Sequence, residues 1–495
     1  MNVVLASSEA VPFAKTGGLA DVASALTRAL LDEGHAATLV IPHHRRQLAG
    51  AGIDAASTGQ TVEINLGTKR VPAEFLEADL PGSTGRVILI DQPAYFDRDG
   101  LYSDESGEGY DDNCERFVFF SRAVLEAARI FGLQPDVLHA NDWQTGLIPA
   151  LLDVEYREQP GFEEATSVLT IHNMAFQGIF WHWDMLLTGL DWKYFNWRQM
   201  EYFNHLNLLK TGIAFADMLT TVSPTYAREI QTAEYGCGLH GVLHARRGDL
   251  VGILNGVDVD VWNPETDSLI AETYSRTSLG RKAACKSALQ QKLGLPARGD
   301  VPLFGMISRM TDQKGFDLIA ACADEFLRED VQIAVLGTGE QRYEGMLRDL
   351  AGAHPAKVSA TIGFDEKLAH EIEAGSDAYL MPSQFEPCGL NQMYSLVYGT
   401  VPIVRSVGGL ADSVVDISDA TLADGTANGF RFDKYDAREL YRQLIRAVEA
   451  YGDREIWAQL VQNGMQQDWS WRRSAGRYVD VYNRARAQRT VAVTS

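Results

Sequence analysis

Lys15 stands two residues ahead of the pair Gly17-Gly18, where a helical pattern that contains Asp21 begins. Helix N-termini attract anions through their N–H groups, glycine lets a ligand approach the backbone, and lysine adds a compact positive charge. These residues therefore predict a phosphate-binding loop. The loop matches neither the Walker A pattern nor the GxGxxG fingerprint, so from the motif alone a surface turn that merely uses its glycines is an equal alternative.

A second basic loop, residues 308–315, follows an apolar run and carries Arg309 and Lys314. Arginine offers a planar fork of donors and lysine a point charge, so both side chains can converge on a diphosphate. Fixed cations of this kind stabilise the negative charge that develops on a departing phosphate group. For an isolated arginine and lysine, a solvated loop or a helix cap is the alternative.

Glu386 lies just beyond another apolar run and precedes Cys388, Gly389, Leu390 and Asn391. A carboxylate at a helix start is favourable in itself, and for a lone glutamate that interpretation is preferred. The residues that follow would present helix N-terminal N–H groups to a phosphate or a sugar, so we predict a binding site here. We treat Cys388 as a small packing residue whose thiol need not react.

Three polar residues follow apolar runs in the first half of the chain, and each has a structural alternative. Asp142 either orients an incoming hydroxyl or caps the helix that starts after it, and the two roles are equally favoured. A histidine at a strand end, such as His172, is more often a structural hydrogen-bonding group than a catalyst. Asn255 precedes Gly256, and Asn-Gly is a common turn.

The segment between residues 180 and 203 is unusually rich in tryptophan. Aromatic faces bind sugar rings, so the segment could be a platform for a glucan acceptor. Aromatic side chains also fill protein cores, and we expect core packing here. The residues concerned are Trp181, Trp183, Trp192 and Trp197.

Apolar runs alternate with helical patterns along the chain, which predicts an α/β fold with parallel sheets. Open sheets of this kind bind ligands at the carboxyl ends of their strands, where the loops described above lie. A helix is expected over residues 19–31. Strands are expected at residues 3–7, 37–41, 87–90, 332–336, 357–362, 378–381 and 401–404, and in the runs that begin at residues 137, 167, 218, 251 and 303.

The length of 495 residues exceeds what one hydrophobic core usually supports, so we expect two Rossmann-like domains. The first spans residues 1–256 and the second residues 257–468, with a hinge at residues 256–263. We expect the segment 469–495 to be helical and to cross back to the first domain.

Composition narrows the classes of partner. A net charge of −22 argues against a nucleic acid or an anionic membrane as a partner, because both would repel such a surface.

Five scattered cysteines fit free thiols in a reducing compartment. The first residues lead straight into a strand without a signal-peptide pattern, and no apolar run is long enough to span a membrane. We therefore expect a soluble cytoplasmic protein. No cluster with metal-ligand spacing is present, so we expect no metal or other cofactor.

The sequence Phe385-Glu386-Pro387-Cys388-Gly389-Leu390, paired with Lys15-Thr16-Gly17-Gly18-Leu19, closely resembles the bacterial glycogen synthase and plant starch synthase family. The resemblance extends in matching order from Lys15 to the run at residues 408–412. It implies the GT-B fold, in which two Rossmann-like domains face each other across a cleft. Many retaining transferases of this fold carry a second glutamate eight positions after the first, whereas this chain has Tyr394 there. Glycogen and starch synthases generally lack that second acid.

The resemblance also implies roles for single residues. His172 would lie beside the donor sugar, where its side chain or its backbone carbonyl would stabilise positive charge at the anomeric carbon. The other implied contacts are Lys15 with the donor's phosphates, Arg309 and Lys314 with the leaving diphosphate, Glu386 with the donor glucose hydroxyls, Asn255 with the sugar, and Phe364 stacked on the base. On sequence alone Phe364 would pass as a core residue.

The resemblance implies transfer of glucose from ADP-glucose to the non-reducing end of an α-1,4-glucan, such as glycogen or a malto-oligosaccharide, with retention of configuration. One alternative is another retaining transferase that uses UDP-glucose or a sucrose- or trehalose-type acceptor. A non-enzymatic glucan-binding relative should lack Arg309, Lys314 or Glu386, and all three are present. A Rossmann dehydrogenase is disfavoured because no GxGxxG follows the first strand.

Overall fold

The structure, a computed structural model, describes residues 1–494 of the chain. The chain divides into two compact units, which are described separately. Unit 1 comprises Met1–Gly256 together with the C-terminal helix that begins at Trp471, and unit 2 comprises Val257–Ser470. Among the described residues, no helix combines the length and the apolar character that crossing a bilayer requires.

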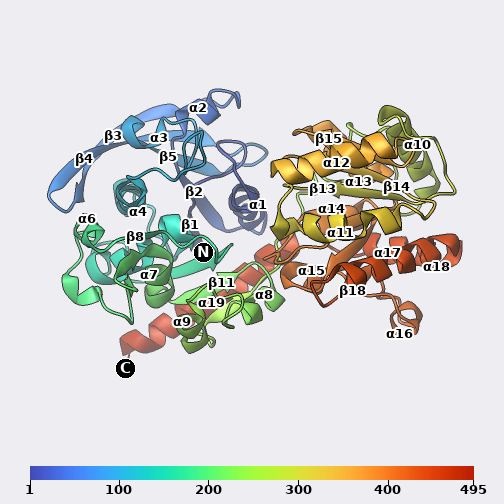
Figure 1. The fold of residues 1–495 in the computed structure, drawn as a ribbon. Helices are drawn as coiled ribbons and strands as arrows, with labels where there is room; N and C mark the ends of the chain where they lie inside the picture. Colours follow the sequence, from blue (N-terminus) through green and yellow to red (C-terminus); the bar gives the residue numbers. More distant parts are fainter. Residues whose placement is uncertain (495) are drawn as a thin grey trace. The chain divides into compact units, whose positions relative to one another are not determined.

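Unit 1 is built on a nine-stranded sheet with the order β12-β11-β7-β6-β1-β2-β5-β4-β3 (Figure 1). The strands from β12 to β5 are parallel, and β1, β6 and β7 are almost wholly buried, as expected for a sheet covered on both faces. From β1 the chain continues to β2 on one side, and from β6 it continues to β7 on the other side. The boundary between β1 and β6 is therefore a topological switch point. The parallel strands are β1 (Asn2–Ala6), β2 (Ala36–Pro42), β5 (Arg86–Asp91), β6 (Val137–Asn141), β7 (Thr166–Ile171), β11 (Met218–Thr221) and β12 (Leu250–Gly252).

One edge of the large sheet of unit 1 is antiparallel, which the sequence analysis did not predict. There β3 (Ala56–Leu66) and β4 (Lys69–Asp79) form a long antiparallel hairpin, and β4 also pairs antiparallel with β5. The two hairpin strands are joined directly through Gly67 and Thr68, a connection too short to cross between parallel strands.

A second, smaller sheet in unit 1 has the order β8-β10-β9 and is antiparallel. It is inserted between β7 and helix α7, and most of the tryptophan-rich segment forms the connection between β8 and β9. Its strands are β8 (Ile179–Trp181), β9 (Glu201–Tyr202) and β10 (His205–Asn207).

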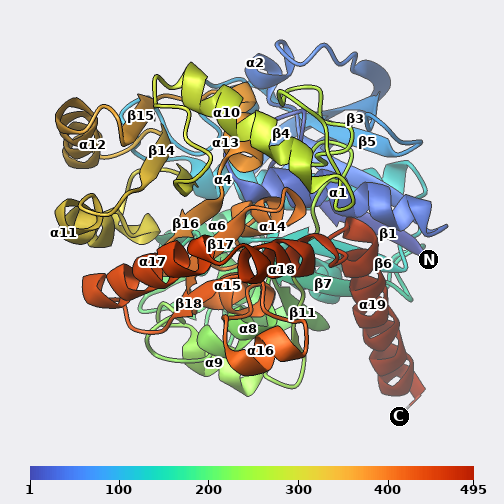
Figure 2. The ribbon, with the colours of Figure 1, turned by 90° about the vertical axis from the view of Figure 1, so that its right-hand side faces the viewer.

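The helices of unit 1 cover its large sheet, and the C-terminal helix α19 (Trp471–Thr494) is one of them. Figures 1 and 2 show α19 beside strands of unit 1, and its residues Trp471, Tyr478 and Tyr482 belong to the same core as Val3 and Leu5. The remaining helices are α1 (Gly18–Asp32), α2 (Arg45–Leu48), α3 (Pro93–Phe96), α4 (Asn113–Ile130), α5 (Ile148–Leu151), α6 (Met185–Thr188), α7 (Leu208–Phe215), α8 (Pro224–Glu229) and α9 (His240–Ala245), the 3₁₀ helices η1 (Trp143–Thr145), η3 (His182–Asp184) and η4 (Trp192–Tyr194), and the π-helix η2 (Leu152–Tyr156).

Unit 2 contains a six-stranded, wholly parallel sheet with the order β15-β14-β13-β16-β17-β18. From β13 the chain adds β14 and β15 on one side of the sheet, and β16, β17 and β18 on the other. The boundary between β13 and β16 is therefore the switch point of the second sheet. Its strands are β13 (Leu303–Ile307), β14 (Gln332–Gly337), β15 (Val358–Ile362), β16 (Ala378–Met381), β17 (Val401–Arg405) and β18 (Phe430–Phe432).

Helices pack on both faces of this sheet and bury two apolar clusters, one on each side. They are η5 (Leu279–Arg281), α10 (Lys282–Lys292), η6 (Asp312–Lys314), α11 (Phe316–Phe326), α12 (Gln341–Ala353), α13 (Glu366–Gly375), α14 (Asn391–Val397), α15 (Gly408–Ser413), α16 (Asp419–Ala423), α17 (Ala437–Gly452) and α18 (Arg454–Met465).

Candidate active site

A cavity of ≈ 190 Å³ lies at the switch point of unit 2. The loop after β13 and the loop after β16 form its walls, because the carboxyl ends of these neighbouring strands meet at one edge of the sheet. The structure therefore brings together side chains far apart in the sequence, such as Lys314 and Glu386, which are 72 positions apart. The polar and charged lining residues are Ser308, Arg309, Lys314, Ser383, Glu386 and Asn391.

Glu386 is held in this cavity as half of an ion pair. Its Oε2 lies 2.5 Å from Nζ of Lys314, and Ser383 donates a hydrogen bond of 3.1 Å to the same oxygen. Glu386 is 7% exposed, so an unpaired charge there would be costly. The helix α14 begins only at Asn391, so Glu386 lies outside its first turn and the helix-start interpretation is wrong.

The loop that carries Glu386 is packed tightly against the start of α15. A Cβ on Gly408 would approach the carbonyl oxygen of Glu386 to 2.0 Å, and Gly408 has a φ of +43°. Only glycine fits here, since both the space and the backbone conformation exclude a side chain. This contact fixes the backbone on which the Glu386 carboxylate is mounted.

Asn391 lines the cavity, but its amide is engaged with the protein. Its Nδ2 donates to the carbonyl oxygen of Ile307 at 2.9 Å and to the hydroxyl of Tyr379 at 2.6 Å. The same hydroxyl bonds the backbone of Ile307. Asn391 therefore ties α14 to the end of β13, and Tyr379 and Ser383 are supporting residues that sequence reasoning missed. Both lie in or directly after β16, a position that could have singled them out.

In unit 1, Asp142 follows β6 in a backbone conformation that is rare for a residue with a side chain, with φ 57° and ψ −170°. Its Oδ1 accepts a hydrogen bond of 2.7 Å from the backbone N–H of His172, and it makes no side-chain cap to the helix η1. The capping interpretation is therefore wrong. Burial raises the pKa of Asp142 to about 7. Strain and a perturbed carboxyl group together are typical of functional sites.

His172 follows β7, and its Nε2 lies 3.0 Å from Oδ1 of Asn141. The Asn141 amide is oriented by its Nδ2, which donates to the carbonyl oxygen of Ala6 at 3.0 Å. Oδ1 therefore accepts, Nε2 of His172 carries the proton, and Nδ1 keeps its lone pair. Burial lowers the pKa of His172 to about 3, so the ring is neutral at physiological pH.

The Lys15 loop is anchored from within by Glu9, a residue that sequence reasoning missed. Glu9 is 3% exposed and accepts hydrogen bonds from the backbone N–H of Thr16 at 2.5 Å and from its hydroxyl at 2.9 Å. Gly17 is the N-cap of α1 and provides no side-chain cap. Lys15 extends outward, where its Nζ lies 2.8 Å from Asp21 with just over half of its side chain exposed.

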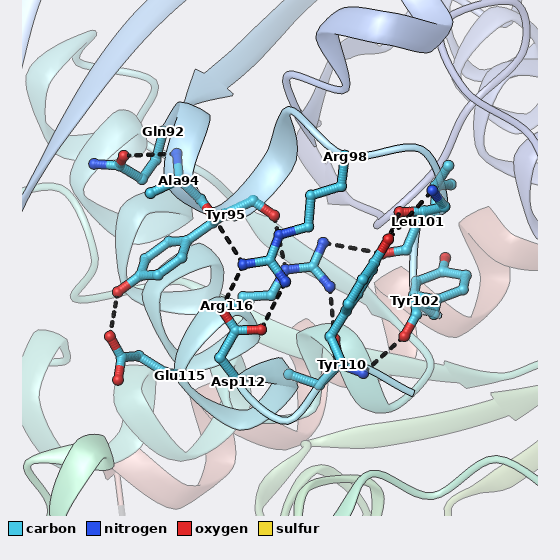
Figure 3. Close-up of polar contacts among 12 residues, drawn as sticks. Gln92, Ala94, Tyr95, Arg98, Leu101, Tyr102, Tyr110, Asp112, Glu115 and Arg116 are labelled. Carbon is cyan, nitrogen blue, oxygen red and sulfur yellow. Dashed lines mark hydrogen bonds and ion pairs between the residues drawn. The ribbon is translucent and has the colours of Figure 1, made fainter. Parts of the chain in front are cut away.

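A buried arginine, Arg116, supports the connection between α3 and α4 (Figure 3). Arg116 donates to the carbonyl oxygens of Tyr95 at 2.8 Å and Leu101 at 3.0 Å, and so fixes the loop between α3 and α4. The next residue, Tyr102, reaches Oγ of Ser8 at 2.6 Å and thereby joins the end of β1. Burial raises the pKa of the Tyr102 hydroxyl, and the carboxylates of Glu9 and Asp142 raise it further.

Two family models match the chain. The starch synthase catalytic domain matches residues 2–245, and the glycosyl transferases group 1 domain matches residues 290–464. The glycogen synthase of Anaeromyxobacter dehalogenans (strain 2CP-C) is 47% identical over 484 residues, which are 97% of this chain and 99% of that protein. Glycogen synthase 1 of Geobacter sulfurreducens is 45% identical over 99% of this chain and 97% of its own length. The chain belongs to the glycogen synthase family.

Solved structures agree with this membership. The catalytic domain of starch synthase IV from Arabidopsis thaliana, bound to ADP and acarbose, matches with a TM-score of 0.89 and 34% identity over 98% of this chain and 99% of its own. The glycogen synthase family thus accounts for both units, which have the GT-B fold expected from the sequence. A sucrose-phosphate synthase from Thermosynechococcus elongatus, with a TM-score of 0.59 and 15% identity, shares the fold alone.

Two further positions expected from the glycogen synthase family lie outside the cavity of unit 2. Phe364 follows β15 and is 92% exposed, so it is no core residue and its ring is open to a stacking partner. Asn255 is buried in unit 1, in an irregular stretch and not in a turn, which excludes the Asn-Gly turn interpretation. Its Oδ1 has no hydrogen-bond partner among the described residues. Cys388 is buried, as a packing residue should be.

The tryptophan-rich segment contradicts our expectation of core packing. Trp181, Trp183, Trp192 and Trp197 expose 61%, 48%, 39% and 70% of their surfaces. Composition could not reveal this, because the same residues fill cores and coat binding surfaces.

Metal-binding geometry is not found in the part of the chain that the structure describes, where no three His, Cys, Asp or Glu side chains form a group that could hold an ion. The cysteines Cys114, Cys237, Cys285, Cys322 and Cys388 are free thiols.

Proposed function

We propose that this member of the glycogen synthase family transfers glucose from ADP-glucose to the non-reducing end of an α-1,4-glucan, with retention of the anomeric configuration. The observation that carries the proposal is the cavity of unit 2, where Arg309, Lys314 and a fixed Glu386 carboxylate meet at a switch point. Its support is the identity to proteins named glycogen synthase and the likeness to a starch synthase domain bound to ADP and acarbose.

Arg309 and Lys314 suit the stabilisation of a leaving diphosphate. Negative charge grows on the β-phosphate as the glycosidic bond breaks, and fixed cations stabilise that charge without reorganisation. Lys314 also holds Glu386, which in our proposal contacts the hydroxyls of the donor glucose. The ion pair holds this carboxylate in position before the donor arrives.

His172 and Asp142 suit the sugar side of the reaction. A neutral imidazole, with a protonated Nε2 held by Asn141, adds no repulsive positive charge near a developing oxocarbenium ion. Asp142 in our proposal orients the acceptor hydroxyl, whose proton passes to the leaving phosphate in a front-face substitution. The other proposed substrate contacts are Lys15, Gly17, Gly18, Asp21, Asn255, Phe364, Cys388, Gly389, Leu390 and Asn391.

The proposal includes a metal-independent reaction, because Arg309 and Lys314 supply the positive charge that a divalent cation would otherwise provide. It also places the protein in the cytoplasm, which the free cysteines support. The partners are small: the nucleotide sugar and a neutral glucan. The domain limits stay those inferred from the sequence, with the hinge at residues 256–263.

A donor comparison tests the function. Purified protein should incorporate labelled glucose into glycogen from ADP-glucose, faster than from UDP-glucose, with or without EDTA. The new linkages should be cleaved by an α-1,4-specific amylase, as retention requires. Transfer to fructose 6-phosphate or glucose 6-phosphate in place of glycogen would favour the sucrose- or trehalose-type alternative and overturn the proposal.

A further inference from the structure

An exposed aromatic surface in unit 1 has no role in the function proposed so far. It consists of Trp181, Trp183 and Trp192, which we name the tryptophan face. Each of these side chains exposes more than a third of its surface. Tryptophan is among the most buried residue types on average, so three exposed tryptophans in contact indicate a binding surface.

The small sheet holds these rings outward. In β8, Phe180 lies opposite the fully buried Leu206 of β10, whereas its neighbour Trp181 lies opposite the exposed His205. Successive side chains of a strand point to opposite faces, so Phe180 faces inward and Trp181 outward. The Phe180 ring packs on Trp143 with 5.7 Å between centroids.

The tryptophan face is also joined to the candidate site through Trp143, which directly follows Asp142. A Cβ on Gly178 would lie 2.4 Å from the Trp143 ring, and Gly178 has a φ of +61°. Glycine therefore lets the segment before β8 lie flat on Trp143. The inner side of the small sheet thus rests on Trp143, the neighbour of the site residue Asp142, while its outer side carries the tryptophan face.

The rings form a continuous series with turned planes. Trp181 and Trp183 have centroids 6.4 Å apart at an interplanar angle of 65°, and Trp183 and Trp192 have centroids 5.5 Å apart at 75°. Trp192 is fixed by its neighbour Asp191, whose side chain accepts a 2.8 Å hydrogen bond from the backbone N–H of Lys193. Because the ring planes turn from one tryptophan to the next, they suit a ligand chain that twists along its length.

Polar side chains alternate with these rings along the sequence. His182 lies between Trp181 and Trp183, with its ring 5.4–5.5 Å from both, and Asp191 and Lys193 flank Trp192. The cores of protein–protein interfaces are depleted of charged residues, so this mixture disfavours a protein partner. A pyranose needs both features, because its C–H faces stack on aromatic rings while its hydroxyls require hydrogen-bond partners.

We propose that the tryptophan face binds a linear α-glucan, as a platform apart from the reacting acceptor end. The ligand class rests on the proposed function, and the site itself rests on the geometry above. A neutral glucan suffers no repulsion from a protein of net charge −22, whereas a second copy of the same chain does. Holding a long chain here would raise the local concentration of acceptor ends without changing the chemistry.

The test compares two double variants that separate aromatic stacking from general apolar character. In Trp181→Leu/Trp183→Leu the surface stays apolar but loses its flat rings, whereas Trp181→Phe/Trp183→Phe keeps aromatic faces. Retardation in amylose-containing native gels measures glucan binding, and initial rates give kcat and KM for glycogen and for maltotriose. Thermal melting and size-exclusion chromatography accompany both variants.

We expect the leucine variant to lose roughly tenfold in glucan affinity and to raise the KM for glycogen to a similar extent. The phenylalanine variant should change both by about threefold or less, since stacking persists in part. For maltotriose, which does not supply the long chain that the platform is proposed to hold, kcat and KM should stay at wild-type values in both variants.

Several results would overturn the platform. These are a leucine variant with wild-type glucan affinity, an equal effect on maltotriose and glycogen, or a change of oligomeric state at unchanged glucan affinity, which would indicate self-association. The outcome is separable from the proposed function. A wild-type protein that transfers glucose while the leucine variant binds amylose normally refutes the platform alone. Retardation that depends on the rings in a protein without transferase activity refutes the function alone.

Discussion

The cavity of unit 2 and the strand-end cluster of unit 1 handle charge in opposite ways. In unit 2 the charges are kept: Lys314 and Glu386 form a 2.5 Å ion pair, and Arg309 is exposed at the cavity wall. In unit 1 burial reduces charge, because it raises the pKa of Asp142 to about 7 and lowers that of His172 to about 3.

This difference teaches what each surface is prepared for. Fixed cations beside a carboxylate suit a ligand that is itself charged, such as a diphosphate joined to a hydroxylated sugar. A weakly charged, strained and hydrogen-bonded cluster suits the positioning of an uncharged sugar hydroxyl, where a free charge would be costly to bury. The comparison fails if charge-removing substitutions have equal effects in both regions.

The largest effect is expected from the cations of unit 2. Arg309→Ala and Lys314→Ala should each lower kcat by about a hundredfold to a thousandfold, because one charge-stabilising donor is lost at the leaving group. The KM for glycogen should change little. Arg348→Ala is the matched control, since Arg348 is exposed in the same unit and pairs with Glu344 in its own helix. Near-wild-type kcat in both site variants would remove the diphosphate assignment.

Glu386→Gln should come next, with a loss of about a hundredfold in kcat. Glutamine keeps the size of the side chain and an oxygen that can accept from Lys314 and Ser383, but it removes the negative charge. We therefore expect the melting temperature to stay close to that of the wild type. Glu371→Gln controls for loss of an ion pair in unit 2, since Glu371 pairs with Lys292. A Glu386 variant that melts early and keeps its specific activity would show a purely structural role.

The sequence allowed the charged cluster of unit 2 to be predicted, but not the properties of the buried cluster of unit 1. Arg309, Lys314 and Glu386 could be placed together because strand-and-loop patterns predict that parallel strands end at one edge. Asp142 was a candidate, but neither its positive φ nor its raised pKa could be inferred, since both arise from the packing of β6 against β7. Glu9 was missed because its role depends on a loop that folds back onto it through Thr16.

Two features that the sequence analysis did not predict, the β3–β4 hairpin and the exposed tryptophans, were missed for different reasons. The β3–β4 hairpin did leave a signal, because the buried Ile64 and Leu66 and the buried Ala73 and Phe75 alternate with exposed or partly exposed residues on either side of Gly67. Period-two alternation about a glycine is typical of a hairpin. The tryptophan face left no such signal, since which side of β8 faces inward depends on its pairing with β10.

Asp142→Asn should change the pH dependence of stability. Burial raises the pKa of Asp142 from 3.8 to about 7, so the folded protein retains a proton that the unfolded chain has released. The stabilisation linked to that proton is complete below the unfolded pKa and is lost as the pH rises through about 7. Asparagine keeps the acceptor for the His172 N–H but does not titrate. The melting temperature of the wild type should therefore fall more steeply than that of the variant between about pH 5 and pH 8. Parallel curves would show that Asp142 is ionised in the folded protein.

The smallest effect is expected at Lys15, and it sharpens the comparison because Lys15 is a cation in the otherwise charge-poor site region of unit 1. Its side chain is 54% exposed and must leave Asp21 to reach a phosphate, so solvent screens most of its attraction. Lys15→Ala should weaken ADP binding by roughly twofold to fivefold in calorimetry at low salt, and the difference should shrink as salt rises. Lys69→Ala is the control, since Lys69 is equally exposed in unit 1 and pairs with Glu115. If Lys15→Ala binds ADP as the wild type does at low salt, the nucleotide is held by unit 2 alone and Lys15 is a surface-loop residue.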